Sequence, residues 1–143
     1  MESNYETDFY QWTIDQSIAI KEGRWQDIDV ANLAEEVESM GKQQRQELTN
    51  RLIILIGHLL KWNYQWGGRG ASWKATILEQ RGSIHELMEE NPSLQPYLNG
   101  EAIRRSYKGA RALAIRETNL DVFPEECPYS IADILNEQFF PGN

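Results

Sequence analysis

Cysteine and proline are scarce in this 143-residue sequence, which contains 1 cysteine and 5 prolines. A single cysteine cannot form a disulfide within one chain, and a free thiol suits a reducing compartment. Pro124 and Pro128 flank Cys127, which predicts a loop residue rather than a metal ligand. We therefore expect a fold that is stabilised by its apolar core, and the length is sufficient for one such core.

Long apolar runs are also missing. The longest, from Leu52 to Leu60, is interrupted by Gly57 and His58 and is much shorter than the ~20 residues of a membrane-spanning helix. The N-terminal segment "MESNYETDFYQW" has neither the basic region nor the apolar region of a secretion signal. These absences lead us to expect a cytosolic, cytoplasmic protein without a membrane segment.

Positive charge is sparse, because 14 Lys and Arg stand against 22 Asp and Glu and the net charge is −8. This argues against general DNA binding, which depends on neutralising phosphates. The acidity lies mostly in residues 1–50, whose net charge is −7, whereas residues 51–143 have a net charge of −1. Either the two parts neutralise each other in the fold, or the acidic part faces a basic partner.

No repeat, low-complexity tract or sustained β-type alternation is present, so we expect helices throughout. Cap residues and glycines predict about five principal helices in a single all-α domain, residues 1–143, packed as a bundle. The apolar spacing between 48 and 66 predicts that this helix is central. The expected helices run from a cap at Thr7 or Asp8 to Gly23, from Asp29 to a stop or bend at Gly41, from about Lys42 to Trp66, from a cap at Ser72 to about Glu90, and from Glu101 to about Thr118, with one short helix capped by Ser130.

An arginine interrupts the apolar face of the helix expected at 73–90. Arg81 lies inside this face, and a buried guanidinium needs a carboxylate partner and further acceptors. Helical phase places Glu36 and Glu38 on the flanks of an apolar arc formed by Val30, Leu33, Val37 and Met40. In the alternative, Arg81 extends its head group into water. We predict a mostly enclosed polar cluster, open at one end, with the members Glu36 or Glu38, His58, Arg81, Trp62 and Trp73.

The helix expected at 101–118 has two different faces. Ser106, Ala110 and Ala114 share one face, where small side chains allow close approach to a neighbouring helix. The other face is basic and has no aromatic residue between its charges, so it is a weak nucleic-acid signal. We favour a solvated face that pairs partly with the acidic N-terminal third. Its basic residues are Arg104, Arg105, Lys108, Arg111 and Arg116.

The two histidines are weak metal candidates. His58 together with His85 and Glu36 or Glu38 would supply the ligand types that zinc, manganese or iron accept. The sequence has neither an HExxH motif nor the repeated ExxH pairs of di-iron bundles. We therefore expect no metal and no other cofactor.

Arg51 and His58 are separated by six residues, so they lie within ~20° of one direction on a helix. This spacing is similar to the Arg-x4–6-His motif of HEPN-type ribonucleases, in which the arginine and histidine act on RNA. Leu52 departs from that motif, because a polar residue usually follows the arginine there. The alternative role for Arg51 is an ion pair with Glu47, four residues earlier.

Five segments together resemble one protein family. They are "TDFYQWTIDQ", "LAEEVESMG", "HLLKWNYQ", "SWKATILEQR" and "FPEECPYSIADILNEQFFP", and they occur in this order across almost the whole chain. The sequence resembles a family that is abundant in cyanobacteria and is catalogued as domain of unknown function 29. The resemblance implies an all-helical, single-domain protein and brings no activity, substrate or catalytic residue. Its motifs include Glu35, Glu36, Glu38, His58, Trp62, Trp73 and Arg81.

For the function, we favour a small interaction or regulatory protein without catalytic activity, whose partner is another protein. The alternative is an enzyme, either ribonuclease-like through Arg51 and His58 or metal-dependent. The sequence leaves the partner and the oligomeric state open.

Overall fold

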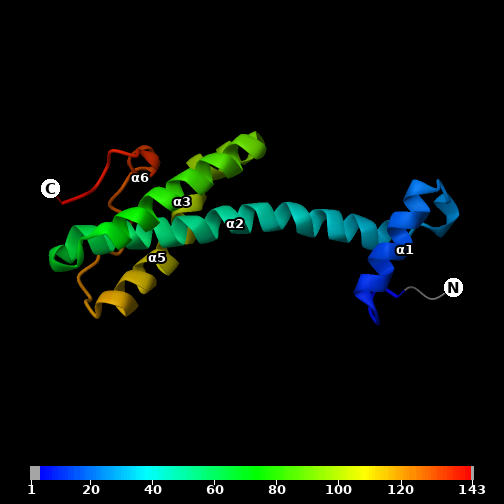
Figure 1. Cartoon of the computed structure of the whole chain (residues 1–143), viewed down its shortest axis with the longest axis horizontal. Helices are drawn as coiled ribbons and strands as arrows, with labels where there is room; N and C mark the ends of the chain where they lie inside the picture. The colour runs from blue at the N-terminus through cyan, green and yellow to red at the C-terminus, as the bar shows by residue number, and fades with distance from the viewer. Residues whose placement is uncertain (1–3, 143) are drawn as a thin grey trace. The chain divides into compact units, whose positions relative to one another are not determined.

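A computed structural model describes residues 4–142, and this part of the chain contains helices and turns but no strand (Figure 1). The expected all-α fold is confirmed. The chain forms two compact units, Met1–Gln43 and Gln44–Asn143. The helices are α1 (Phe9–Lys21), α2 (Val30–Tyr64), α3 (Ala71–Glu90), α4 (Gln95–Asn99), α5 (Ala102–Thr118) and α6 (Ile131–Leu135), with short 3-10 turns at Trp25–Asp27, Trp66–Gly68 and Pro92–Leu94.

The helix α2 is continuous over 35 residues, so the predicted stop or bend at Gly41 is wrong. A glycine inside a helix costs only about 1 kcal/mol relative to alanine. Good helix formers surround it in "EVESMGKQQRQEL", and their combined preference outweighs that cost. The two helices expected at 29–41 and 42–66 are therefore one element, whose first part belongs to the Met1–Gln43 unit.

The Met1–Gln43 unit is built from α1 and the start of α2. Asp8 caps α1, as predicted, by accepting a hydrogen bond from the Gln11 backbone N–H. Gly23 follows the helix end with a φ of +68°, a conformation that favours glycine. Trp12 is 3 % exposed, and its indole N–H donates to Asp29 at the start of α2 over 3.1 Å.

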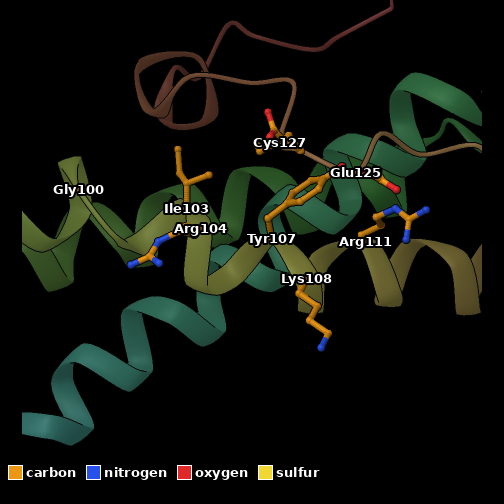
Figure 2. Close-up of a pocket in the computed structure, with 9 residues that line it drawn as sticks. Gly100, Ile103, Arg104, Tyr107, Lys108, Arg111, Glu125 and Cys127 are labelled. Atoms are coloured by element: carbon orange, nitrogen blue, oxygen red, sulfur yellow. The ribbon is translucent and has the colours of Figure 1, made fainter.

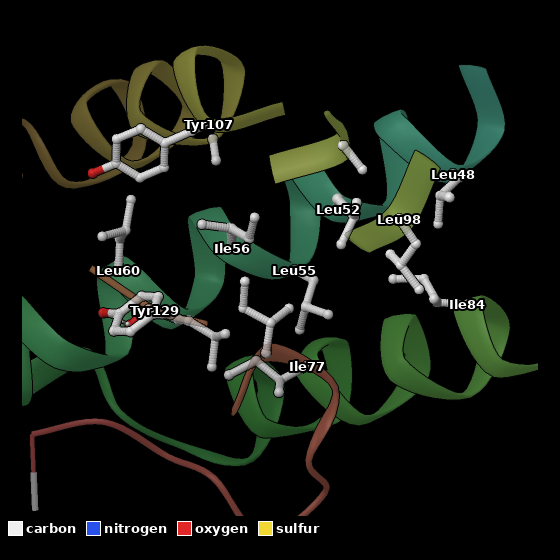
Figure 3. Packing of buried hydrophobic residues seen from close by; sticks show 14 of the residues in the cluster. Leu48, Leu52, Leu55, Ile56, Leu60, Ile77, Ile84, Leu98, Tyr107 and Tyr129 are labelled. Carbon is white, nitrogen blue, oxygen red and sulfur yellow. Dashed lines mark hydrogen bonds between the residues drawn. The ribbon is translucent and has the colours of Figure 1, made fainter. Parts of the chain in front are cut away.

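The core of the Gln44–Asn143 unit lies along the second half of α2, which confirms the central role expected for this segment. Apolar side chains of α2, α3, α4 and α5 form one buried cluster (Figure 3). Trp66, at the end of the apolar spacing that predicts this core, lies beyond the end of α2 and is 65 % exposed. The fully buried residues of α2 are Leu48, Leu52, Leu55, Ile56, Leu59 and Leu60.

Small residues bring α2 and α5 close together, as the spacing on α5 predicts. A Cβ atom on Gly57 of α2 would lie 2.7 Å from Leu113 Cδ2 and 3.2 Å from the Ala110 carbonyl oxygen. A Cβ atom on Gly109 of α5 would lie 2.9 Å from Ile53 Cδ1. A larger residue at either position would therefore displace a side chain of the facing helix, and at Gly57 it would also crowd the Ala110 carbonyl.

The remaining helix ends agree in part with the sequence. Ser130 caps α6, as predicted, through its hydroxyl oxygen and the Asp133 N–H. Ser72 is not the cap of α3, because the helix begins one residue earlier and the cap position is occupied by Gly70. The carbonyl of Ser72 instead accepts a hydrogen bond from the Thr76 hydroxyl inside the helix.

Candidate functional site

Arg81 is fully buried, as expected, but its partners are backbone carbonyls rather than carboxylates. Its Nε donates to the Ile134 oxygen over 2.7 Å. Its Nη2 donates to the Phe139 oxygen over 2.8 Å and to the Asp133 oxygen over 3.5 Å. The predicted pairing of Arg81 with a glutamate of the second expected helix is therefore wrong.

The carbonyls of the chain end replace the carboxylate that a buried guanidinium was expected to need. Burial lowers the pKa of Arg81, and the charge of Glu137 raises it. The Phe140 ring lies 5.3 Å from the guanidinium carbon. Within residues 4–142, Nη1 of Arg81 has no hydrogen-bond partner. Arg81 thus attaches the C-terminal segment to α3, which is a structural role.

A second arginine holds the same C-terminal segment. Arg69 Nε donates to the carbonyl of Trp62 over 2.7 Å at the end of α2. Its Nη2 donates to the carbonyls of Pro141 and Gly142, both over 3.1 Å. Arg69 therefore joins the last turn of α2 to the end of the chain.

The carboxylates of the predicted cluster belong to the other unit of the chain. Glu36 accepts a hydrogen bond from the Tyr5 hydroxyl, and this bond is the main reason that the pKa of Tyr5 rises to about 12. Glu38 is exposed. The sequence contained no signal for the Tyr5 pairing, because Tyr5 precedes α1 and lies outside any helical pattern.

His58 forms a local hydrogen bond rather than one with Arg81. Its Nδ1 lies 2.9 Å from the Ile54 carbonyl, one turn earlier in α2. Burial lowers the pKa of His58, and the nearby charge of Lys61 lowers it further. Because the hydrogen bond of His58 stays within α2, the prediction that His58 shares a hydrogen-bonded cluster with Arg81 is wrong.

The two indoles expected at the open end of the cluster have separate neighbours. Trp62 packs against Phe140, with ring centroids 5.1 Å apart. Trp73 lies beneath the ammonium of Lys61, 4.5 Å from the ring centroid. Lys61 is 4 % exposed and donates to Glu117 over 3.0 Å. Sequence reasoning missed this buried lysine, because a lysine near a helix end usually reaches solvent.

Arg51 forms the ion pair with Glu47 that its spacing predicts, over 3.1 Å, and also donates to Gln80 over 3.4 Å. Arg51 and His58 therefore hydrogen-bond to different partners. His85, the remaining metal candidate, is exposed on α3. Among residues 4–142, no three or more His, Cys, Asp and Glu side chains are grouped so that they could hold a metal ion.

The basic face of α5 is partly paired with acids close to it in sequence. Arg105 pairs with Glu101 over 2.9 Å, and Arg111 pairs with Asp121 over 3.3 Å. These partners are not in the acidic N-terminal third, so the expectation of pairing with that third is wrong for Arg105 and Arg111. Lys108 and Arg116 are exposed.

A pocket of about 650 Å³ lies between α5 and the loop that follows it (Figure 2). Tyr107 and Arg111 fix the loop by donating to the carbonyls of Pro124 and Phe123 over 2.6 and 3.1 Å. Basic side chains of α5 line one part of the pocket, and acidic side chains of the loop line another. The lining includes Ile103, Arg104, Tyr107, Lys108, Glu125, Glu126 and Cys127.

Apolar side chains are exposed on the Met1–Gln43 unit, along the apolar arc that helical phase defines. Val30, Val37 and Met40 are 69 %, 62 % and 60 % exposed. Tyr10 and Trp25 of the same unit are 75 % and 68 % exposed. Helical phase correctly groups Val30, Val37 and Met40 on one side of the helix, but it does not show what covers that side, and here these residues are exposed.

Comparison with known proteins identifies a family and no closer relative. A family model described as "Domain of unknown function DUF29" matches residues 4–140, in agreement with the five-segment resemblance. No curated protein matches the chain. No solved structure matches it either. Over residues 4–142, no helix is long and apolar enough to cross a membrane.

Proposed function

We propose that this chain, which belongs to the DUF29 family, is an interaction protein without catalytic activity that binds another protein through its Met1–Gln43 unit. The supporting observation is the exposed apolar surface of that unit. Five of its large apolar side chains are at least 60 % exposed, namely Tyr10, Trp25, Val30, Val37 and Met40. Val30, Val37 and Met40 share one side of α2 by helical phase, and exposed apolar residues that lie together mark a binding surface more often than single ones do.

The exposed apolar residues do not result from a lack of internal structure in this unit. Trp12 is buried and hydrogen-bonded to Asp29, and the Gln16 side chain bonds to the backbone at both Asp27 and Asp29. The rings of Tyr5, Phe9 and Trp12 pack together with centroids 4.8 to 5.7 Å apart. The unit is thus internally ordered and still presents apolar groups to solvent.

The charge of the unit adds a requirement for the partner. Residues 1–43 contain 3 Lys and Arg against 10 Asp and Glu, a net charge of −7. A partner with a basic surface is attracted to this charge, and nucleic acid is repelled by it. Binding to a basic protein surface is therefore the class of interaction that we propose. We place this interaction in the cytosol, where the free thiol of Cys127 would stay reduced.

The size of the native complex tests the proposal. The tagged full-length chain, expressed in its native host, should elute from a gel-filtration column at a larger mass than the monomer. Val37→Glu should restore elution as a monomer, because it places a charge within the apolar surface. Val122→Glu is the matched control, since Val122 is 55 % exposed and belongs to the other unit.

Two results would contradict the proposal. The first is a failure of the gel-filtration test: either the wild-type chain elutes as a monomer, or the complex persists in Val37→Glu. The second is catalysis: cleavage of mixed RNA that His58→Ala abolishes, or stoichiometric bound metal in the purified protein, would favour the enzyme class instead.

A further inference from the structure

One face of α2 within the Met1–Gln43 unit is exposed along three turns. Its residues follow one another at spacings of four, three and four, which keeps them within ~60° of each other around the helix. All of them are exposed. They are Val30, Ala34, Val37 and Gly41, and we call them the α2 seam.

The spacing and the sizes of these residues suit a second helix. Alternation of four and three is the pattern that allows side chains of one helix to fit between those of another. Ala34 and Gly41 are small, and a Cβ atom on Gly41 would meet nothing within 4 Å. A partner helix can therefore approach the backbone closely while Val30 and Val37 provide the apolar contact.

Helix α1 leaves the α2 seam uncovered. It is joined to α2 by the hydrogen bonds of Trp12 with Asp29 and of Tyr5 with Glu36. Asp29 and Glu36 precede Val30 and Val37 by one residue, so they point ~100° away from the seam. The α2 seam is a separate face of the helix.

Carboxylates border the seam on both sides. Asp29 and Glu36 lie on one flank and Glu38 on the other. Glu38 forms no ion pair within residues 4–142 and is exposed. Lys42 is the only cation of α2 within this unit. An occupant of the seam therefore gains from positive charges beside its apolar stripe.

The same flanks disfavour a second copy of this chain. In a parallel or an antiparallel pairing of two α2 seams, the flanks with Asp29, Glu36 and Glu38 meet flanks of the same sign. The net charge of −7 on each unit adds to this repulsion. Charge complementarity thus selects a basic partner over self-association.

We infer that the occupant of the α2 seam is an amphipathic helix of a partner protein, with an apolar stripe flanked by Lys or Arg. This inference rests on the proposed interaction function and specifies the partner's element. The seam spans the residues from Val30 to Gly41, about 17 Å along the helix axis, so the partner helix contributes about three to four turns.

The experiment uses the full-length chain and synthetic peptides of about 18 residues, measured by calorimetry and circular dichroism. The first peptide carries Leu and Ala at four–three spacing with Lys on the flanks. The second has Glu in place of Lys, and the third has the composition of the first in scrambled order. The first should bind and gain helicity, and it should bind at least about tenfold more tightly than the others.

Substitutions locate the binding on the seam. Val37→Lys should weaken binding of the first peptide about tenfold, because it places a cation opposite the apolar stripe. Val122→Lys is the matched control and should change the affinity by less than about twofold. A retained dichroism spectrum for both variants shows that folding is intact.

Each other outcome overturns the inference. If the scrambled peptide binds as tightly as the first, no amphipathic helix is required; if the acidic peptide does so, no positive charge is required. An unchanged affinity in Val37→Lys shows that the peptide does not bind at the α2 seam. A wild-type chain that sediments as a dimer and becomes a monomer in Val37→Lys assigns the seam to a second copy. If the native complex depends on Val37 but the first peptide does not bind, the interaction function stands and the basic helix is wrong. If the wild-type chain forms no native complex at all, the proposed function itself is contradicted.

Discussion

Replacing Arg81 with methionine tests the role that the structure gives to this residue. Methionine has a similar length, so the change removes the charge and the donors while most of the buried volume stays filled. The carbonyls of Ile134 and Phe139 lose hydrogen bonds of 2.7 and 2.8 Å from a charged donor. Each such bond contributes about 1.5–3 kcal/mol, which gives a gross loss of about 3–6 kcal/mol.

Part of this loss is recovered, because methionine does not have the desolvation cost of a buried guanidinium. In the described part of the chain Nη1 of Arg81 has no hydrogen-bond partner, so removing this donor breaks no hydrogen bond. We expect Arg81→Met to lower the free energy of unfolding by about 2–4 kcal/mol, a large share of the ~5–15 kcal/mol of an ordinary domain.

Urea denaturation followed by circular dichroism measures this change. Arg104→Met is the matched control, because the Arg104 side chain is 75 % exposed and its nearest carboxylate oxygen lies 3.9 Å away. We expect the control to change the free energy of unfolding by less than about 0.5 kcal/mol. A loss below about 1 kcal/mol in Arg81→Met would refute the argument that its carbonyl contacts stabilise the C-terminal segment.

Three further predictions concern packing, protonation and the loop after α5. Gly57→Ala should lower the free energy of unfolding, measured by urea denaturation, by about 1–3 kcal/mol, since its Cβ would lie 2.7 Å from Leu113 Cδ2. Gly82→Ala is the matched control, because a Cβ atom there would meet nothing within 4 Å, and it should raise the free energy of unfolding by up to about 1 kcal/mol. His58 should titrate below the ordinary histidine pKa in an NMR titration, because burial disfavours its charged form. Because the folded state binds a proton at His58 less readily than the unfolded state does, the contribution of neutral His58 to stability is present above about pH 6.5 and is lost as the pH falls through the lowered folded-state pKa. His58→Gln should remove this pH dependence of the free energy of unfolding. Tyr107→Phe should cost about 1 kcal/mol of thermal stability, measured by calorimetry, because it removes a hydrogen bond of 2.6 Å to a loop carbonyl; an unchanged melting temperature would contradict this.

The regular part of the fold could be predicted because it repeats. The apolar spacing from Leu48 to Leu60 defines a face that is wide enough to be buried on several sides, and the structure buries it. Caps such as Asp8 and Ser130 were predictable for a similar reason, since each acts on backbone groups only three residues away. Local rules were sufficient where the contacts are local.

The polar cluster could not be predicted, because its partners come from segments without periodicity. The acceptors of Arg81 lie more than 50 residues later, in the C-terminal segment. They are backbone carbonyls, which every residue has, so no residue type in the sequence marks them as acceptors. The exposure of Val37 was missed for a different reason: a helical pattern shows which residues lie together, and it contains no information on whether another element covers them. The exposed face thus became visible only in the structure.

Arg69 and Arg81 recognise the tail by its main chain, and this has a consequence for how the tail tolerates change. Carbonyl oxygens are the same whatever side chain they belong to, so replacing exposed Glu137 or Gln138 leaves both attachments in place. Removing or adding one residue between Ile134 and Pro141 would shift the carbonyls by about 3 Å relative to the two guanidinium groups. The length of the tail is therefore constrained, whereas its exposed side chains can be replaced. An insertion there is more damaging than a substitution.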